Sequence, residues 1–136
     1  MIETHQRHIL ALLLAGVLSG YAGPSASQNP GAIASGKLEF QTSCAVCHGN
    51  NASGNGPMAA VLNVPPADLT TLAKNNNGAF PFLRVIETID GRYDTIAHGG
   101  RDMPIWGIRY RENQDPALAR ARILDLTLYL ESIQDK

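Results

Sequence analysis

The chain contains only two cysteines, and both stand in the run Cys44-Ala45-Val46-Cys47-His48. On a helical turn, residues three and four positions apart lie on the same face. Two thiols and an imidazole can therefore meet one edge of a porphyrin and its metal. In such a C-x-x-C-H run the cysteines form thioethers with haem and the histidine ligates the iron. The sequence therefore predicts one haem c, covalently attached through Cys44 and Cys47, with His48 as an axial iron ligand.

Other uses of the two cysteines fit the sequence less well. A disulfide between cysteines three residues apart would be strained, and it would close almost no loop. A thioredoxin-like redox pair needs a βαβ framework, which the sequence does not indicate. A zinc site needs about four ligands, and His98 is the only histidine besides His48 outside the first segment of the chain.

The sixth position on the iron has three candidate ligands, Met58, Met103 and His98. Met58 follows His48 too closely for the chain to round the porphyrin edge. Met103 lies much further along, and the following Pro104 biases it toward extended backbone, which suits a ligand held out from a loop. Met103 is the predicted second metal ligand, with His98 or an open sixth site as alternatives.

The first segment of the chain has the layout of a secretory signal peptide. Arg7 precedes an apolar run over residues 9–18, and small residues follow up to Ala22. We expect a signal peptide over residues 1–22 and a flexible leader over 23–34. The cytochrome-type domain would then cover 35–136. The apolar run is shorter than the roughly 20 residues that span a bilayer, so an uncleaved anchor is the less favoured alternative. The predicted location is the periplasm, without stable membrane insertion.

Charge excludes one class of partner. The chain has 11 Lys and Arg against 12 Asp and Glu, for a formal net charge of −1. Without a basic cluster, it is not expected to bind nucleic acid.

Spacing of apolar residues and capping residues predicts helices and loops only. The best-defined helix starts at Asp115, an N-cap, with Pro116 in its first position, and carries an apolar stripe up to Ile133. Further helices are expected over 35–47, 81–90 and 93–98, with short helical pieces at 58–61 and 68–73. Gly36 interrupts the first helix, where it costs about 1 kcal/mol relative to alanine, so we expect another helix to approach it closely.

With its attachment motif and the later Met103-Pro104, the chain resembles the class I cytochrome c family. Gly36 and Phe40 match the family's glycine and aromatic residue on the first helix, and Tyr129 matches an aromatic of the last helix that crosses it. The resemblance implies an all-α fold, a small bundle of three to five helices around the haem. It also implies that the Pro57 carbonyl accepts a hydrogen bond from His48 Nδ1.

The residues around the methionine are candidates for binding the cofactor's carboxylates. Hydrogen bonds to a haem propionate are expected from one or more of Arg101, Trp106, Arg109 and Tyr110.

Histidine and methionine together would fill both axial positions and leave no open site for a substrate. A methionine ligand also favours ferrous iron and raises the reduction potential. The predicted function is therefore one-electron transport in a respiratory chain rather than catalysis. The partners would be redox proteins such as a periplasmic dehydrogenase, oxidase or reductase, free or tightly bound. The alternative is a haem-based enzyme or gas-binding sensor, with a labile or open sixth site.

Overall fold

The first helix begins earlier than the sequence predicts. The computed structural model describes residues 29–92, 103–112 and 115–135, and in it α1 spans Pro30–Glu39. The side chain of Asn29 accepts a hydrogen bond from Gly31 N, and Pro30 occupies the first helical position, a favourable start. Residues 30–34 of the expected flexible leader are therefore helical. The expected leader over 23–29 otherwise lies almost wholly outside the described residues.

Shorter segments continue from this helix without a break. A π-helical turn, η1 (Phe40–Cys44), leads into α2 (Ala45–His48), which ends at Gly49 with φ of 79°. Single turns of 3₁₀ helix follow in a long loop: η2 (Ala59–Val61), η3 (Leu69–Thr71) and η4 (Lys74–Asn76). The remaining helices are α3 (Phe82–Asp90), α4 (Trp106–Arg111) and α5 (Pro116–Ser132).

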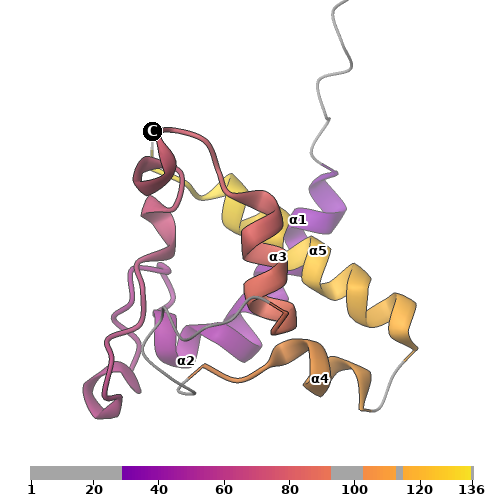
Figure 1. The fold of residues 1–136 in the computed structure, drawn as a ribbon, viewed down its shortest axis with the longest axis horizontal. Helices are drawn as coiled ribbons and strands as arrows, with labels where there is room; N and C mark the ends of the chain where they lie inside the picture. Colours follow the sequence, from indigo (N-terminus) through magenta and orange to yellow (C-terminus); the bar gives the residue numbers. More distant parts are fainter. Residues whose placement is uncertain (1–28, 93–102, 113–114, 136) are drawn as a thin grey trace, which may run out of the picture.

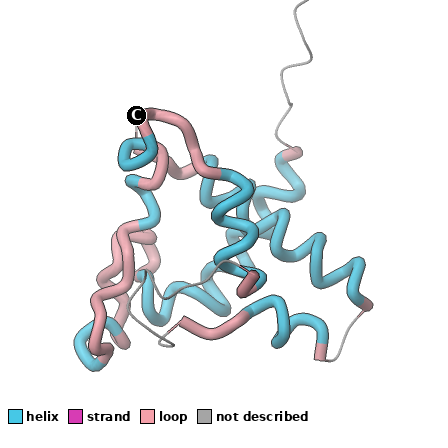
Figure 2. Tube along the Cα trace, in the orientation of Figure 1, coloured by secondary structure: helices cyan, strands magenta, loops and turns pink. Residues whose placement is uncertain are grey.

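Most of the predicted elements are confirmed by this arrangement. Asp68 caps the short helical piece that follows it, Gly91 ends α3, and Asp115 caps α5. Over the described ranges the chain forms helices and loops and no strand (Figure 2), as the predicted all-α class requires. The helix expected over residues 93–98 lies outside the described residues.

Two helices from opposite ends of the chain, α1 and α5, pack directly on each other (Figure 1). A Cβ atom built on Gly36 would overlap the backbone carbonyl of Asp125 in α5. One turn further on, the rings of Phe40 and Tyr129 lie with centroids 5.4 Å apart. The close approach predicted at Gly36 is therefore confirmed, and α5 is the helix that makes it.

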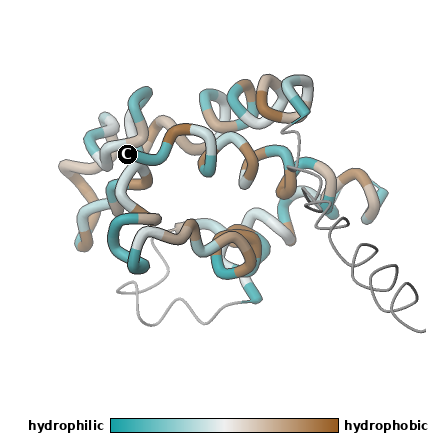
Figure 3. The backbone as a smooth tube through the Cα atoms, turned by 90° about the horizontal axis from the view of Figure 1, so that it is seen from above, coloured by the Kyte–Doolittle hydropathy of each residue, from teal (hydrophilic) through white to brown (hydrophobic). Residues whose placement is uncertain are grey.

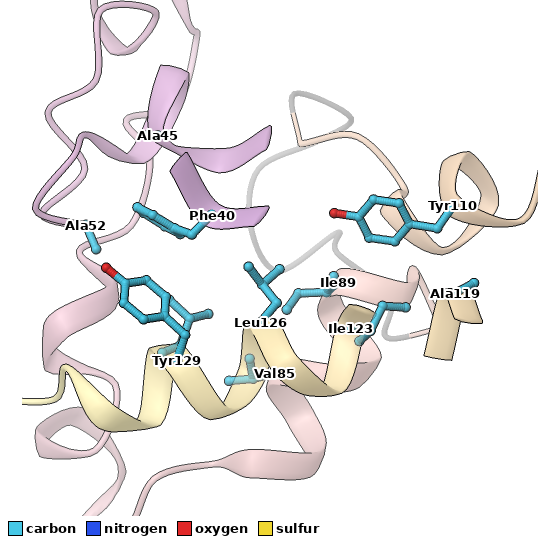
Figure 4. Close-up of a cluster of buried hydrophobic side chains, with 11 residues drawn as sticks. Phe40, Ala45, Ala52, Val85, Ile89, Tyr110, Ala119, Ile123, Leu126 and Tyr129 are labelled. Atoms are coloured by element: carbon cyan, nitrogen blue, oxygen red, sulfur yellow. The ribbon is translucent and has the colours of Figure 1, made fainter. Parts of the chain in front are cut away.

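The hydrophobic core forms around this crossing. α3 and α4 both pack against α5 and against each other. Figure 4 shows the core side chains converging from η1, α2, α3, α4 and α5 and from the loop at Ala52. The buried hydrophobic residues are Phe40, Ala45, Ala52, Val85, Ile89, Tyr110, Ala119, Ile123, Leu126, Tyr129 and Leu130. Each large aliphatic side chain buried in this way contributes about 1.5–3 kcal/mol.

Hydrophobic and hydrophilic residues alternate along the helices in Figure 3. Within the described ranges, none of the helices combines the length and the apolar character needed to cross a bilayer.

Candidate haem-attachment site

The predicted attachment residues lie on two consecutive helical turns. Cys44 is the last residue of η1, and Cys47 and His48 are the last two residues of α2. All three side chains are half-buried, and both cysteines are free thiols. The two sulfurs are therefore not joined in a disulfide, and the structure leaves both available for thioether bonds.

The loop after His48 folds back over the end of α2. Its backbone N–H groups donate to the last carbonyls of this helix: Gly54 to His48 (2.8 Å), Gly56 to Cys47 (3.0 Å) and Met58 to Val46 (2.9 Å). These bonds satisfy carbonyls that a helix end otherwise leaves without partners. Gly56 approaches so closely that a Cβ atom there would lie 2.6 Å from the Cys47 carbonyl oxygen. The glycine-rich loop thus fixes the backbone of the attachment motif.

The hydrogen bond predicted from His48 Nδ1 to the Pro57 carbonyl is wrong. Nδ1 of His48 donates instead to the carbonyl of Ala67, at 3.0 Å. Pro57 belongs to the loop segment 54–58, whose backbone bonds to the end of α2. The later segment that contains Ala67 is the one that contacts the imidazole. Gly54 lies so close to the Pro66 carbonyl that a Cβ atom on Gly54 would overlap it, and this close packing places Ala67 near His48.

Ala67 has a sequence signal, because Pro65-Pro66 precede it and favour extended backbone. The contact fixes the orientation of the His48 ring. Because a carbonyl can only accept, Nδ1 carries the proton and the Nε2 lone pair is left free. Burial lowers the pKa of His48, against the opposite effect of the bond to Ala67. A neutral imidazole oriented by a backbone carbonyl is the form that ligates metals. The residues present therefore fit a covalently attached haem with His48 as a ligand.

The Cys44 thiol lies in a less favourable environment for ionisation. Burial, followed by the negative charge of Glu39 and the neighbouring Cys47, raises the pKa of Cys44 to about 12. Cys44 also packs against the core cluster. The first attachment residue is therefore part of the folded core.

Met103 comes from a different part of the chain and packs against the same core cluster as Cys44. The segment that follows it is held against the end of α3. A Cβ atom on Gly91 would overlap the side chain of Ile105, and one on Gly107 would overlap Asp90. Close packing on both sides therefore anchors the stretch that leads from Met103 into α4.

Among the propionate candidates, Trp106 and Tyr110 lie on α4 with their ring centroids 5.6 Å apart. The Arg109 guanidinium lies 5.5 Å from the centre of the Trp106 ring. The Tyr110 hydroxyl donates to Glu39 at 2.7 Å, so its proton is not available to a propionate. Arg101 lies outside the described residues.

Two acids that the sequence did not single out hold α4 in place, the buried Asp90 and the half-buried Glu39. Asp90, at the end of α3, pairs with Arg111 of α4 at 2.7 Å and also with Arg92. Glu39, at the end of α1, accepts from Tyr110. Their partners lie on helices far along the chain, so no local spacing identifies these acids.

Comparison with known proteins agrees with this geometry. Residues 31–120 match the family model described as cytochrome C oxidase, cbb3-type, subunit III. No curated protein and no solved structure matches the chain. The matched residues cover the attachment motif, the loop that folds over it, and α4. Cytochromes of this kind are generally electron carriers rather than enzymes, and membership implies a covalent haem c. The chain belongs to this family of monohaem c-type cytochromes.

Proposed function

We propose that the protein is an exported one-electron carrier whose single haem c is attached through Cys44 and Cys47. His48 and Met103 would ligate its iron. The observation that carries the proposal is the orientation of His48, whose Nδ1 donates to Ala67 and leaves Nε2 for the metal. Two free thiols on the neighbouring turns of the same continuous helix complete the set.

Each group of the chain has a separate task in this function. Cys44 and Cys47 hold the macrocycle, and the Ala67 carbonyl keeps the imidazole of His48 from turning. Met103 would supply the second protein ligand to the iron, from a segment fixed by the packing of Ile105 and Gly107. When bound, the haem supplies an iron that changes between the ferric and ferrous states by one electron. With both His48 and Met103 as ligands, the iron would have no position left for a substrate, which suits a carrier.

The surface around the attachment motif supports transfer to a protein partner. No Asp, Glu, Lys or Arg occurs between Glu39 and Asp68. Val46, Met58 and Val61 are exposed in this stretch, and Met58 is bonded to Val46 through the backbone. An uncharged, partly apolar face of this kind would dock on a partner by contact rather than by charge steering.

Export and partner choice are parts of the same proposal. The signal peptide over residues 1–22 would deliver the protein to the periplasm, where a dehydrogenase, a reductase or a respiratory oxidase would exchange electrons with it. The description of the matched family, a subunit of an oxidase, favours an oxidase among these.

Optical spectra of the purified holoprotein test the axial ligands. The ferric protein should show the weak far-red band of sulfur-to-iron charge transfer, and the reduced protein should not bind CO. Met103→Leu should abolish the band and admit CO. Met58→Leu is the matched control and should change neither property, because Met58 lies exposed beside α2.

Rapid CO binding by the unaltered protein, without the far-red band, would contradict the proposal. Such an open site would instead favour the haem-based enzyme or gas sensor.

A further inference from the structure

The side chain of Glu39, at the end of α1, accepts four hydrogen bonds. It is 12% exposed. One carboxylate oxygen accepts from Ser43 Oγ and from the Tyr110 hydroxyl, both at 2.7 Å. The other accepts from Arg122 of α5, from Nη2 at 2.6 Å and Nε at 3.1 Å. A half-buried carboxylate is therefore paired with one guanidinium and hydrogen-bonded to two hydroxyls.

These hydrogen bonds keep Glu39 ionised. Burial by itself would raise its pKa, but the bonds from Ser43, Tyr110 and Arg122 outweigh this effect and lower it. Burial and the bond to Glu39 raise the pKa of Tyr110, so this hydroxyl remains a donor. The site thus holds one fixed negative charge and one fixed positive charge at neutral pH.

The negative charge lies next to the first attachment residue. Glu39 is bonded to Ser43, which directly precedes Cys44. The carboxylate also contributes to the raised pKa of the Cys44 thiol, as expected for a charge close to the sulfur. The thioether formed by this sulfur would bring the edge of the macrocycle to the same place.

We propose that Glu39 and Arg122 shift the reduction potential of the haem attached at Cys44 in opposite directions, and that their pairing keeps these two shifts in balance. The proposal rests on the proposed function, because it needs the covalent haem. The oxidised centre carries one more positive charge than the reduced centre. A nearby carboxylate therefore stabilises the ferric state, and a nearby guanidinium stabilises the ferrous state. Reduction transfers one electron to the iron, and no bond at Glu39 is made or broken.

Because Glu39 and Arg122 have opposite charges, removing each should shift the midpoint potential in opposite directions. A purely structural role of the pair would not predict this difference in sign. In the purified holoprotein, Glu39→Gln should raise the midpoint potential and Arg122→Met should lower it. Each ferric-to-ferrous ratio at a fixed potential should change by roughly three- to tenfold, and a tenfold change is 59 mV for one electron. The double variant should lie near the original potential. The measurement is an optical titration against an electrode.

Controls keep charge and structure apart. Glu87→Gln removes an exposed carboxylate on α3 and should not move the potential. Glu39→Asp and Arg122→Lys disturb the hydrogen bonds but keep the charges, so their potentials should stay near the original. They also provide a second test if a charge-removing variant does not fold.

Shifts in the same direction for Glu39→Gln and Arg122→Met, or no shift in either, would overturn the inference. So would large shifts in the two charge-keeping variants. The proposed function has its own readout, which is covalent haem in the unaltered protein, seen as a pyridine haemochrome spectrum after acid–acetone extraction. Absence of a covalent haem would contradict the proposed function. A covalent haem whose midpoint potential is the same in all variants would contradict only the role of Glu39 and Arg122.

Discussion

Substituting Gly36 by alanine tests how closely α1 and α5 approach. A Cβ atom at this position would lie 2.5 Å from the carbonyl carbon of Asp125 and 2.9 Å from Cβ of Tyr129. Ordinary contacts between carbon atoms are about 3.5–4.0 Å, so α1 would have to move away from α5 by about 1 Å. The obstacle is mostly backbone, and it cannot turn aside as the end of a flexible side chain can.

Two effects of opposite sign decide the size of the change. Alanine in place of glycine inside a helix contributes about 1 kcal/mol of stability. Overpacking a well-packed contact costs about 1–3 kcal/mol and occasionally more. Because backbone meets backbone here, we expect a cost at the upper end and a net loss of about 2 kcal/mol. For a domain of this size the melting temperature would fall by roughly 10 °C.

Thermal unfolding of the ferric holoprotein, followed by far-UV circular dichroism, measures this loss. Gly36→Val should be less stable still, because its side chain is larger and branched. Ser35→Ala is the matched control in the neighbouring, exposed position and should stay within about 0.5 kcal/mol of the original. If Gly36→Ala were as stable as the original protein or more so, the gain in helix propensity would equal or exceed the cost of overpacking. The close crossing of the two helices would then be refuted.

Four further outcomes are expected. Asp115→Ala should destabilise the protein by about 1 kcal/mol in urea unfolding through loss of the α5 cap, whereas Asp115→Asn should keep most of that stability. Asp90→Ala removes the partner of Arg111 and should cost about 1.5–3 kcal/mol; it should also raise the affinity of the ferric iron for added imidazole, and unchanged affinity would argue against anchoring of the methionine segment through α4. The lowered pKa of Glu39 stabilises the fold above its unfolded value near 4.5, and this contribution is lost as pH falls through the folded value; Glu39→Gln should therefore show a smaller decline in urea midpoint between neutral and acid pH. Since residues 40–67 contain no Asp, Glu, Lys or Arg, oxidation of the reduced protein by anionic ferricyanide and by a cationic cobalt(III) complex should respond equally weakly to salt, by about twofold or less, and a steep dependence of opposite sign for the two would contradict an uncharged face.

Local signals in the sequence predicted much of the fold. The Asp115-Pro116 pair marks the start of α5 because cap and first-turn chemistry depend only on neighbouring residues. Gly36 in the middle of an apolar helical pattern predicted a close helix contact, since glycine there has a cost that packing must offset. The same kind of signal was overlooked at Asn29-Pro30, which lies within a stretch rich in small and polar residues.

The site was less predictable where it depends on contacts between distant segments. Two segments of the loop after His48, one around Pro57 and one around Ala67, come near the attachment motif. Sequence spacing alone does not indicate which carbonyl accepts from the imidazole. The choice of Ala67 over Pro57 depends on how Gly54 meets Pro66. Glu39 is a harder case, because its partners Tyr110 and Arg122 lie 71 and 83 residues further along the chain.

The burial of Cys44 also bears on the order in which the protein matures. The thiolate is the reactive form of cysteine, and a pKa raised from 9.0 to about 12 reduces its population about a thousandfold at neutral pH. A chain that closed α1 onto α5 before receiving its cofactor would hold this half-buried thiol almost entirely in its less reactive, protonated form. We therefore expect thioether formation to be faster on a chain that is still open than on the folded chain. Folding ahead of attachment would slow this reaction, and a factor that keeps the chain unfolded until the haem is attached would raise the yield of holoprotein.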